Sequence, residues 1–240
     1  MQEICFERNP ALYSQLEIQQ LRYYLRAVLY KLYLATLNLE QLWSMSHTKR
    51  DTVFHVLQNS LDRLECSDDE LLLISFAFEG FLFQGRAFLD FYMLHLCLFL
   101  RTGHQGRMSR KRFDRALKNV PQSPLSEKAV QVKEYFDTRV FAPSAQSWLS
   151  PENWGTLLES LRDKIAHRDR LRPSFDSDET LVGKVLLDWP TMQKTTYQRF
   201  CQYMQNEMFY LVTDISPILY ELDWKAGPYK PDLWQMESHS

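Results

Sequence analysis

Residues 18–42 read IQQLRYYLRAVLYKLYLATLNLEQL, and their apolar positions decide the fold class. Apolar residues recur from Ile18 to Leu42 at alternating spacings of three and four. This seam consists of Ile18, Leu21, Leu25, Val28, Leu32, Ala35, Leu39 and Leu42. It predicts a long helix, over about residues 12–43, that packs along its whole length in a bundle. A second apolar row at Tyr23, Tyr30 and Leu37 predicts a buried face wider than one seam.

The composition is typical of a folded helical protein and argues against several other classes of protein. Only 7 of 240 residues are glycine, which argues against sandwiches and barrels with many tight turns. A hydrophobic share of 45% excludes a disordered chain. The net charge of −2 means that attraction to nucleic acid or anionic lipid needs a local patch. The four cysteines form no CxxC, and no signal peptide is seen, so we expect a cytoplasmic protein.

Helical periodicity continues along the chain. After a connection at 46–52, helices are predicted over about 53–64, 67–101, 107–119, 126–141, 150–167 and 191–214. Pro173–Asp178 is predicted as a polar loop, a short extended segment is expected near 181–189, and Ser216-Pro217 predicts a kink or a restart. We therefore expect an all-α, antiparallel helical bundle of four to six main helices. It would form a single domain over 1–222, followed by an irregular tail over 223–240.

The apolar helix over 67–101 is long enough to cross a membrane, but charges interrupt it. Glu79, Arg86 and Asp90 share one helical stripe, which predicts a bundle helix without membrane insertion. Arg86 and Asp90, at i and i+4, are expected to pair in the core. The alternative is that Glu79 or Asp90 reaches a functional site. Peripheral membrane association through this Phe-rich helix is a third, weaker function hypothesis.

One motif at the end of the 150–167 helix carries chemistry. Residues 162–167 read RDKIAH, with Asp163 beside Arg162 and His167 five positions later. Arginine binds phosphate through a bidentate fork, and histidine titrates near neutral pH. Since RNA supplies its own 2′-hydroxyl nucleophile, these two side chains can suffice for cleavage without a metal or cofactor. No other catalytic motif or metal-ligand spacing is present in the sequence.

RDKIAH resembles the Arg-x4–6-His motif of the HEPN superfamily (higher eukaryotes and prokaryotes nucleotide-binding domains). The resemblance implies a HEPN-like helical bundle and a metal-independent endoribonuclease, acting as a homodimer with both motifs in one cleft. It also implies that Arg162 and His167 are catalytic and that Asp163 supports them. The expected setting is a toxin or a defence effector, with an antitoxin protein as the partner of a toxin.

A second match to the motif, Arg50-Asp51-Thr52-Val53-Phe54-His55, is interpreted as a decoy because it lacks the Ile-Ala approach to the histidine. On an ideal helix, Arg162 and His167 point about 140° apart. They meet only if the helix ends or distorts near Ala166, or if a dimer shares the cleft.

A basic patch is the candidate RNA-binding surface. Its residues, Arg107, Lys111, Arg115 and Lys118, are expected on one helix face opposite Phe113 and Leu117, to contact phosphates without sequence preference. The alternative is a solvated face. The alternative for RDKIAH is a solvated helix end, with Glu159–Arg162 and Asp163–His167 as ordinary pairs. The whole chain would then be a non-catalytic module that binds a partner protein or a nucleotide.

Overall fold

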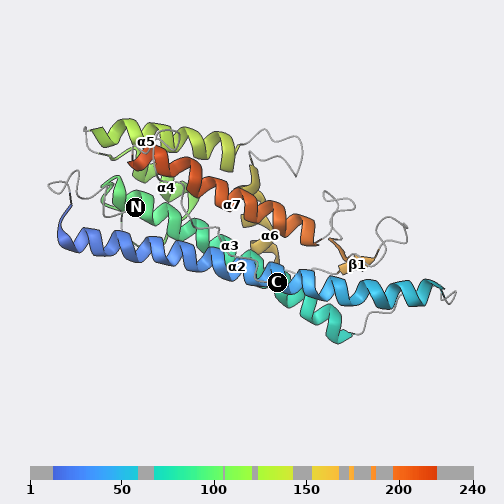
Figure 1. Cartoon of the computed structure of the whole chain (residues 1–240). Helices are drawn as coiled ribbons and strands as arrows, with labels where there is room; N and C mark the ends of the chain where they lie inside the picture. Colours follow the sequence, from blue (N-terminus) through green and yellow to red (C-terminus); the bar gives the residue numbers. More distant parts are fainter. Residues whose placement is uncertain are drawn as a thin grey trace.

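Two long antiparallel helices, α2 and α3, form the base of the bundle (Figure 1). The computed structural model describes residues 13–58, 68–104, 106–120, 124–142, 153–167, 173–175, 185–187 and 197–220. In these ranges the six α-helices are α2 (Gln15–Gln58), α3 (Asp68–Phe99), α4 (Arg110–Leu117), α5 (Pro124–Tyr135), α6 (Trp154–His167) and α7 (Tyr197–Tyr220). The all-α bundle is therefore confirmed. The tail over 223–240 lies outside the described residues, as does the expected helix start at Ser150-Pro151.

Five of the eight seam residues on α2 are buried, as their periodicity predicts, and Ile18, Leu25 and Leu32 are half-buried. Leu21, Val28, Ala35, Leu39 and Leu42 are all at most 3% exposed. The expected second buried row is wrong, because Tyr23, Tyr30 and Leu37 lie on the solvent side. In this bundle α2 packs chiefly on α3 and α7, and these two neighbours cover only one side of it.

Helix α2 also extends further than the sequence predicts. The expected connection at 46–52 is wrong, because the helix continues unbroken to Gln58. No glycine or proline lies between Ser44 and Gln58. Polar residues alone made this segment resemble a loop, but none of them breaks a helix.

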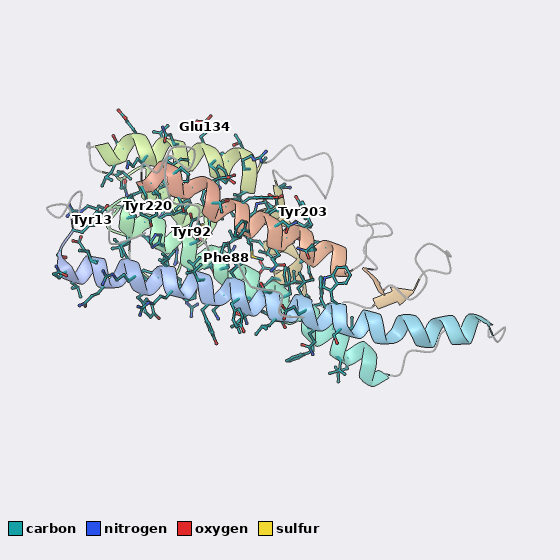
Figure 2. The ribbon with its side chains drawn as sticks, viewed as in Figure 1. Tyr13, Phe88, Tyr92, Glu134, Tyr203 and Tyr220 are labelled. Carbon is teal, nitrogen blue, oxygen red and sulfur yellow. The ribbon has the colours of Figure 1, made fainter. Side chains whose placement is uncertain are left out.

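Helix α3 is the central helix of the bundle. It contacts α2, α4, α6 and α7, and Phe78, Phe81, Phe88 and Leu89 on it are fully buried. Phe88 stacks on Tyr92 at 6.0 Å between ring centres (Figure 2). Within the described residues, Leu72–Phe99 is the one segment long and apolar enough to cross a membrane, and 44% of its most apolar window is buried inside the bundle.

Helix α7 lies parallel to α3. The rings of Phe78 and Phe200 are 5.7 Å apart in the first halves of the two helices, and those of Phe99 and Tyr220 are 5.3 Å apart at their ends. Of the kink or restart expected at Ser216-Pro217, the restart is wrong, since α7 continues to Tyr220 with Pro217 inside it, and the kink stays a prediction. The Ser216 hydroxyl donates to the Val212 carbonyl at 2.6 Å, a local bond in the turn that proline interrupts.

Helix α5 covers α7 in the opposite direction. Lys128 donates to the Leu219 carbonyl at 2.8 Å, and the Tyr135 hydroxyl donates to Asp214 at 2.8 Å. The helix predicted over 126–141 is α-helical only to Tyr135 and ends in a π-helical turn, η1 (Phe136–Val140).

A small two-stranded sheet follows α6. Strand β1 (Pro173–Phe175) pairs antiparallel with β2 (Val185–Leu187). β2 confirms the extended segment expected near 181–189. The first three residues of the loop predicted over 173–178 form β1 instead, because β2 supplies a partner strand that was not visible from the loop's own composition.

Candidate functional site

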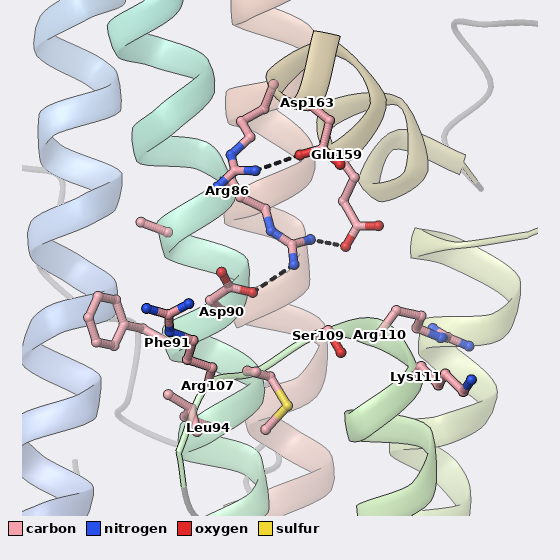
Figure 3. Close-up of a pocket in the computed structure, with 13 residues that line it drawn as sticks. Arg86, Asp90, Phe91, Leu94, Arg107, Ser109, Arg110, Lys111, Glu159 and Asp163 are labelled. Carbon is pink, nitrogen blue, oxygen red and sulfur yellow. Dashed lines mark hydrogen bonds and ion pairs between the residues drawn. The ribbon is translucent and has the colours of Figure 1, made fainter. Parts of the chain in front are cut away.

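A cavity of about 860 Å³ opens between α3, α6 and the start of α4 (Figure 3). Three chain segments line it. They contribute, in order, Arg86, Ala87, Asp90, Phe91 and Leu94; Arg107, Met108, Ser109, Arg110 and Lys111; and Glu159, Arg162 and Asp163. Parts of two features that the sequence singled out separately therefore line one cavity: Arg162 and Asp163 of the RDKIAH motif, and Arg107 and Lys111 of the basic patch.

Helix α6 presents its motif residues from a buried apolar face. Trp154, Leu158 and Leu161 are at most 1% exposed and fix the helix against its neighbours. Gly85 on α3 permits a close approach, since a Cβ there would lie 3.3 Å from the Leu158 methyl groups. The polar side of α6 then faces the cavity.

Arg86 joins α3 to α6 inside the cavity. Its guanidinium bonds Asp90 at 2.9 Å and also pairs with Glu159 (Figure 3). The Arg86–Asp90 pair confirms the sequence prediction, and Asp90 on α3 lines the same cavity as Arg162 on α6. The expected local pair between Glu159 and Arg162 is wrong, because Glu159 reaches across to α3 instead. Glu79 is half-buried on α3 and is not among the cavity-lining residues.

Burial controls the ionisation of this pair. It lowers the pKa of Arg86, while Asp90 raises it and the positive charge of Arg162 lowers it further. Burial raises the pKa of Asp90, and the charges of Arg86 and Arg162 oppose that rise. The two groups are thus stabilised in their charged forms chiefly by each other.

Arg162 pairs with its neighbour Asp163 at 2.5 Å. Its guanidinium carbon also lies 5.9 Å from the centre of the Phe83 ring on α3. The Asp163 side chain is 61% exposed. Water therefore screens this ion pair, and an incoming anion can compete for the guanidinium.

His167 is the last residue of α6, and its side chain lies outside the described residues. Because the helix is regular through His167, the directions of Arg162 and His167 from the helix axis remain about 140° apart. Neither the pairing of His167 with Asp163 nor its entry into the cavity is described. Residues Arg50 and His55 lie within α2, and their side chains are likewise outside the described residues.

The basic patch is divided by the structure. Arg107 and Lys111 line the cavity and are exposed. Arg115 lines a second hollow, and Lys118 is the exposed C-cap of α4. The four residues do not share one helix face as expected, because α4 begins only at Arg110, after its N-cap Ser109. Phe113 and Leu117 are buried on the opposite side, as predicted.

Arg110 is a cavity residue that the sequence did not single out. Its side chain bonds Asp114 at 2.8 Å, pairs with Asp137 and lies 4.6 Å from the centre of the Phe141 ring. The Asp114 partner is visible as an i, i+4 spacing, whereas Asp137 and Phe141 come from η1 and the residue that follows it. Arg107 and Lys111, in contrast, have no ion-pair partner in the described parts of the chain.

Among the described residues, no group of three His, Cys, Asp or Glu side chains is arranged to hold a metal ion. Searches against models of protein families, curated proteins and solved structures find no match to this chain.

Proposed function

We propose that this chain is a HEPN-like, metal-independent endoribonuclease of the cytoplasm, and that the cavity around Arg162 holds the RNA backbone. The observation that carries the proposal is that Arg162 shares a cavity with Arg107 and Lys111. These residues are about 50 positions apart in sequence and were selected for different reasons, one as a motif and the others as a basic patch. A toxin or defence role, with an antitoxin as partner of a toxin, is part of the same proposal.

The charges of the cavity favour an anionic ligand. Five cationic side chains line it (Arg86, Arg107, Arg110, Lys111 and Arg162), against three carboxylates (Asp90, Glu159 and Asp163). Arg86 and Arg110 are each held by two carboxylates, so their charges are largely neutralised locally. Arg107 and Lys111 are left to attract phosphates, and Arg162 can exchange its exposed partner Asp163 for one.

In the proposed reaction the RNA 2′-hydroxyl loses its proton to His167 and its oxygen attacks the adjacent phosphorus. The bond from phosphorus to the 5′-oxygen breaks, and that oxygen takes up a proton from protonated His167, which returns to its neutral form. The products are a 2′,3′-cyclic phosphate and a 5′-hydroxyl. Arg162 binds the phosphate and stabilises the negative charge that develops on its oxygens. Asp163 orients Arg162 and His167 and balances their positive charge.

A homodimer is the proposed functional state, and the exposed face of α3 supports it. Leu72, Phe76 and Phe83 are exposed on α3, and Phe76 is 66% exposed. Asp90 is 18 residues beyond Leu72, or about five helical turns, so both lie on the same side of the helix. A second copy that covers the apolar part of this face would therefore lie next to the cavity.

The alternative function is a non-catalytic helical module that binds a partner protein or a nucleotide. The ion pairs of Arg86 with Asp90 and Glu159 favour it in one respect, because they can serve the packing of α3 and α6 alone. A module of this kind has no use for His167 at the end of α6. The two functions are therefore separated by a variant of that residue.

The test is cleavage of mixed total RNA in EDTA by the wild type and by His167→Ala. An Arg26→Ala variant, at an exposed α2 position that does not line the cavity, serves as the matched control. We expect cyclic-phosphate ends from the wild type and the control, and a rate lower by about 10²–10⁴-fold in His167→Ala. Equal cleavage by all three proteins, or by none, would contradict the proposal and favour the module.

A further inference from the structure

A second hollow lies on the other side of the basic segment. It has a volume of about 310 Å³ and is formed by the turn after α3 and the side of α4. Its polar wall consists of Thr102, His104, Arg112, Arg115 and Asn119. No acidic side chain is among its described lining residues. A hollow of this size and charge fits one small anion.

The backbone of the turn makes room for the hollow. Arg101 and Gly103 have φ angles of 53° and 71°, in the left-handed region where glycine is the least strained residue. A Cβ on Gly103 would have no neighbour within 4 Å, so this side of the turn is open. The turn carries the chain away from α3 and places His104 opposite α4.

Terminal carbonyls of α3 and α4 beside the hollow already accept hydrogen bonds from backbone donors. The Cys97 carbonyl accepts from the Thr102 N–H at 3.0 Å, and the Leu98 carbonyl accepts from the Arg101 N–H at 3.1 Å. At the end of α4, the Ala116 carbonyl accepts from the Asn119 N–H at 2.9 Å. The cationic side chains therefore determine the charge of the hollow.

One polar atom in the wall lacks a partner. His104 Nε2 is buried from solvent and has no hydrogen-bond partner within the described ranges, whereas its backbone N–H is held by the Thr102 hydroxyl at 3.3 Å. An imidazole nitrogen that carries its proton is a donor. A buried donor without an acceptor costs free energy, which a bound oxygen would recover.

Arg112 connects the hollow to the main cavity. Its side chain donates to the Arg107 carbonyl at 2.9 Å, so the backbone of Arg107 forms part of the partition between the two. The side chain of Arg107 lines the main cavity, while Arg112 and Arg115 line the hollow. An extended polyanion can thus meet cations on both sides of this partition.

We propose that the hollow is a phosphate-binding subsite in which Arg115, Arg112 and the His104 imidazole bind one phosphate group of the RNA, outside the cavity where cleavage occurs. The proposal rests on the proposed function for the source of the phosphate, an RNA chain. The chemistry of the subsite does not depend on that source, since a free phosphate presents the same oxygens to the same donors.

The experiment measures two ligands on the full chain. Inorganic phosphate is titrated by calorimetry, and a fluorescent single-stranded RNA is titrated by anisotropy at several salt concentrations. The variants are Arg115→Ala and His104→Gln, with Arg26→Ala as the matched arginine control. We expect roughly tenfold weaker phosphate binding in both subsite variants. In Arg115→Ala the slope of log affinity against log salt for RNA falls by about 0.7, the value for one phosphate contact with a single strand.

Each result decides the question. If both subsite variants bind phosphate and RNA as Arg26→Ala does, the subsite is wrong, even where the wild type cleaves RNA. If the wild type neither binds nor cleaves RNA but binds phosphate through Arg115 and His104, the proposed function fails and the subsite stands for a free phosphate. If the wild type cleaves RNA, we expect the subsite variants to raise KM and to leave kcat unchanged. A lower kcat with an unchanged KM would overturn the proposal.

Discussion

The guanidinium carbon of Arg162 lies 5.9 Å from the centre of the Phe83 ring, so the motif residue of α6 rests on the apolar face of α3. Phe83 is 41% exposed, and Phe76 and Leu72 are exposed on the same face of α3. A cation near an aromatic face gains about 0.5–1 kcal/mol at such an exposed position. Any partner that covers Phe83 would also restrict Arg162.

The first prediction concerns this face. Phe76→Asp should convert the proposed homodimer to a monomer in sedimentation equilibrium, because a carboxylate cannot be buried in an apolar interface without a partner. The matched control is Tyr23→Asp on α2, where the tyrosine is 64% exposed and the helix-propensity cost is similar. We expect the control to remain dimeric. Dimers in both variants, or a monomeric wild type, would contradict the proposed interface.

Removing Arg86 should destabilise the bundle. The Arg86 side chain is only 14% exposed. Arg86→Met removes the cation between Asp90 and Glu159 and leaves both carboxylates without it. We expect the free energy of unfolding in urea to fall by about 2 kcal/mol, below the full value for a buried pair because both carboxylates are partly exposed.

A rescue variant separates charge from packing at this position. Adding Asp90→Asn and Glu159→Gln to Arg86→Met removes the two carboxylates and should restore most of the lost free energy of unfolding. If the triple variant is as unstable as Arg86→Met, packing rather than ion pairing is the contribution of Arg86.

Stability should fall on acidification through His95. This side chain is 1% exposed, burial lowers its pKa from 6.5 to about 4, and its Nε2 lies 3.1 Å from the Tyr220 hydroxyl. Between pH 6.5 and 4 the unfolded chain binds a proton that the folded chain does not, so the free energy of unfolding falls as pH falls. From pH 7 to 5 this amounts to about 2 kcal/mol.

The check is a series of urea midpoints from pH 7 to 5 for the wild type and His95→Gln. Glutamine cannot be protonated, so the variant should lose this part of the pH dependence. Bonds from Lys133 and Arg110 outweigh burial and lower the pKa of Asp137 below its ordinary value of 3.8. Asp137 therefore changes stability only below about pH 4, outside the range from pH 7 to 5. Parallel midpoints in the two proteins would refute the assignment to His95.

Gly155 should not tolerate a side chain. A Cβ at this position would lie 2.7 Å from Val140 Cγ1, 2.9 Å from the Phe141 ring and 3.0 Å from the Val140 carbonyl oxygen. Although alanine favours the helix, Gly155→Ala should lower the free energy of unfolding by about 2 kcal/mol through overpacking. Ser160→Ala, exposed on the same helix, should change it by less than about 0.5 kcal/mol. A Gly155→Ala protein as stable as the wild type would contradict the close packing of α6 on η1.

The parts of this fold that follow from local periodicity could be predicted, and those that depend on distant partners could not. The seam from Leu21 to Leu42 follows from apolar residues spaced three and four apart. The Arg86–Asp90 pair follows from a spacing of four. The ion pair of Arg86 with Glu159 joins positions 73 residues apart (159 − 86), and no local spacing reports it. The exposure of Tyr23 and Tyr30 likewise depends on which side of α2 its neighbours cover.

The candidate site divides in the same way. Its residue types, Arg162, Asp163, Arg107 and Lys111, could be selected from the sequence, because charge and motif are local properties. Their meeting in one cavity depends on the approach of α6 to α3 at Gly85 and on the start of α4 at Arg110. Glu159 pairs with Arg86 on α3 rather than with Arg162. The sequence favoured Arg162 because it lies three residues after Glu159 on the same helix.

The most direct test of the central claim is the rate of RNA cleavage in EDTA by Arg162→Ala, Lys111→Ala and the control Arg26→Ala, compared with the wild type. The account predicts a kcat about 10²–10³-fold lower for Arg162→Ala, and for Lys111→Ala a higher KM with a smaller salt dependence. Arg26→Ala should match the wild type. Cleavage by Arg162→Ala at the wild-type rate, or no cleavage by the wild type, would contradict the account.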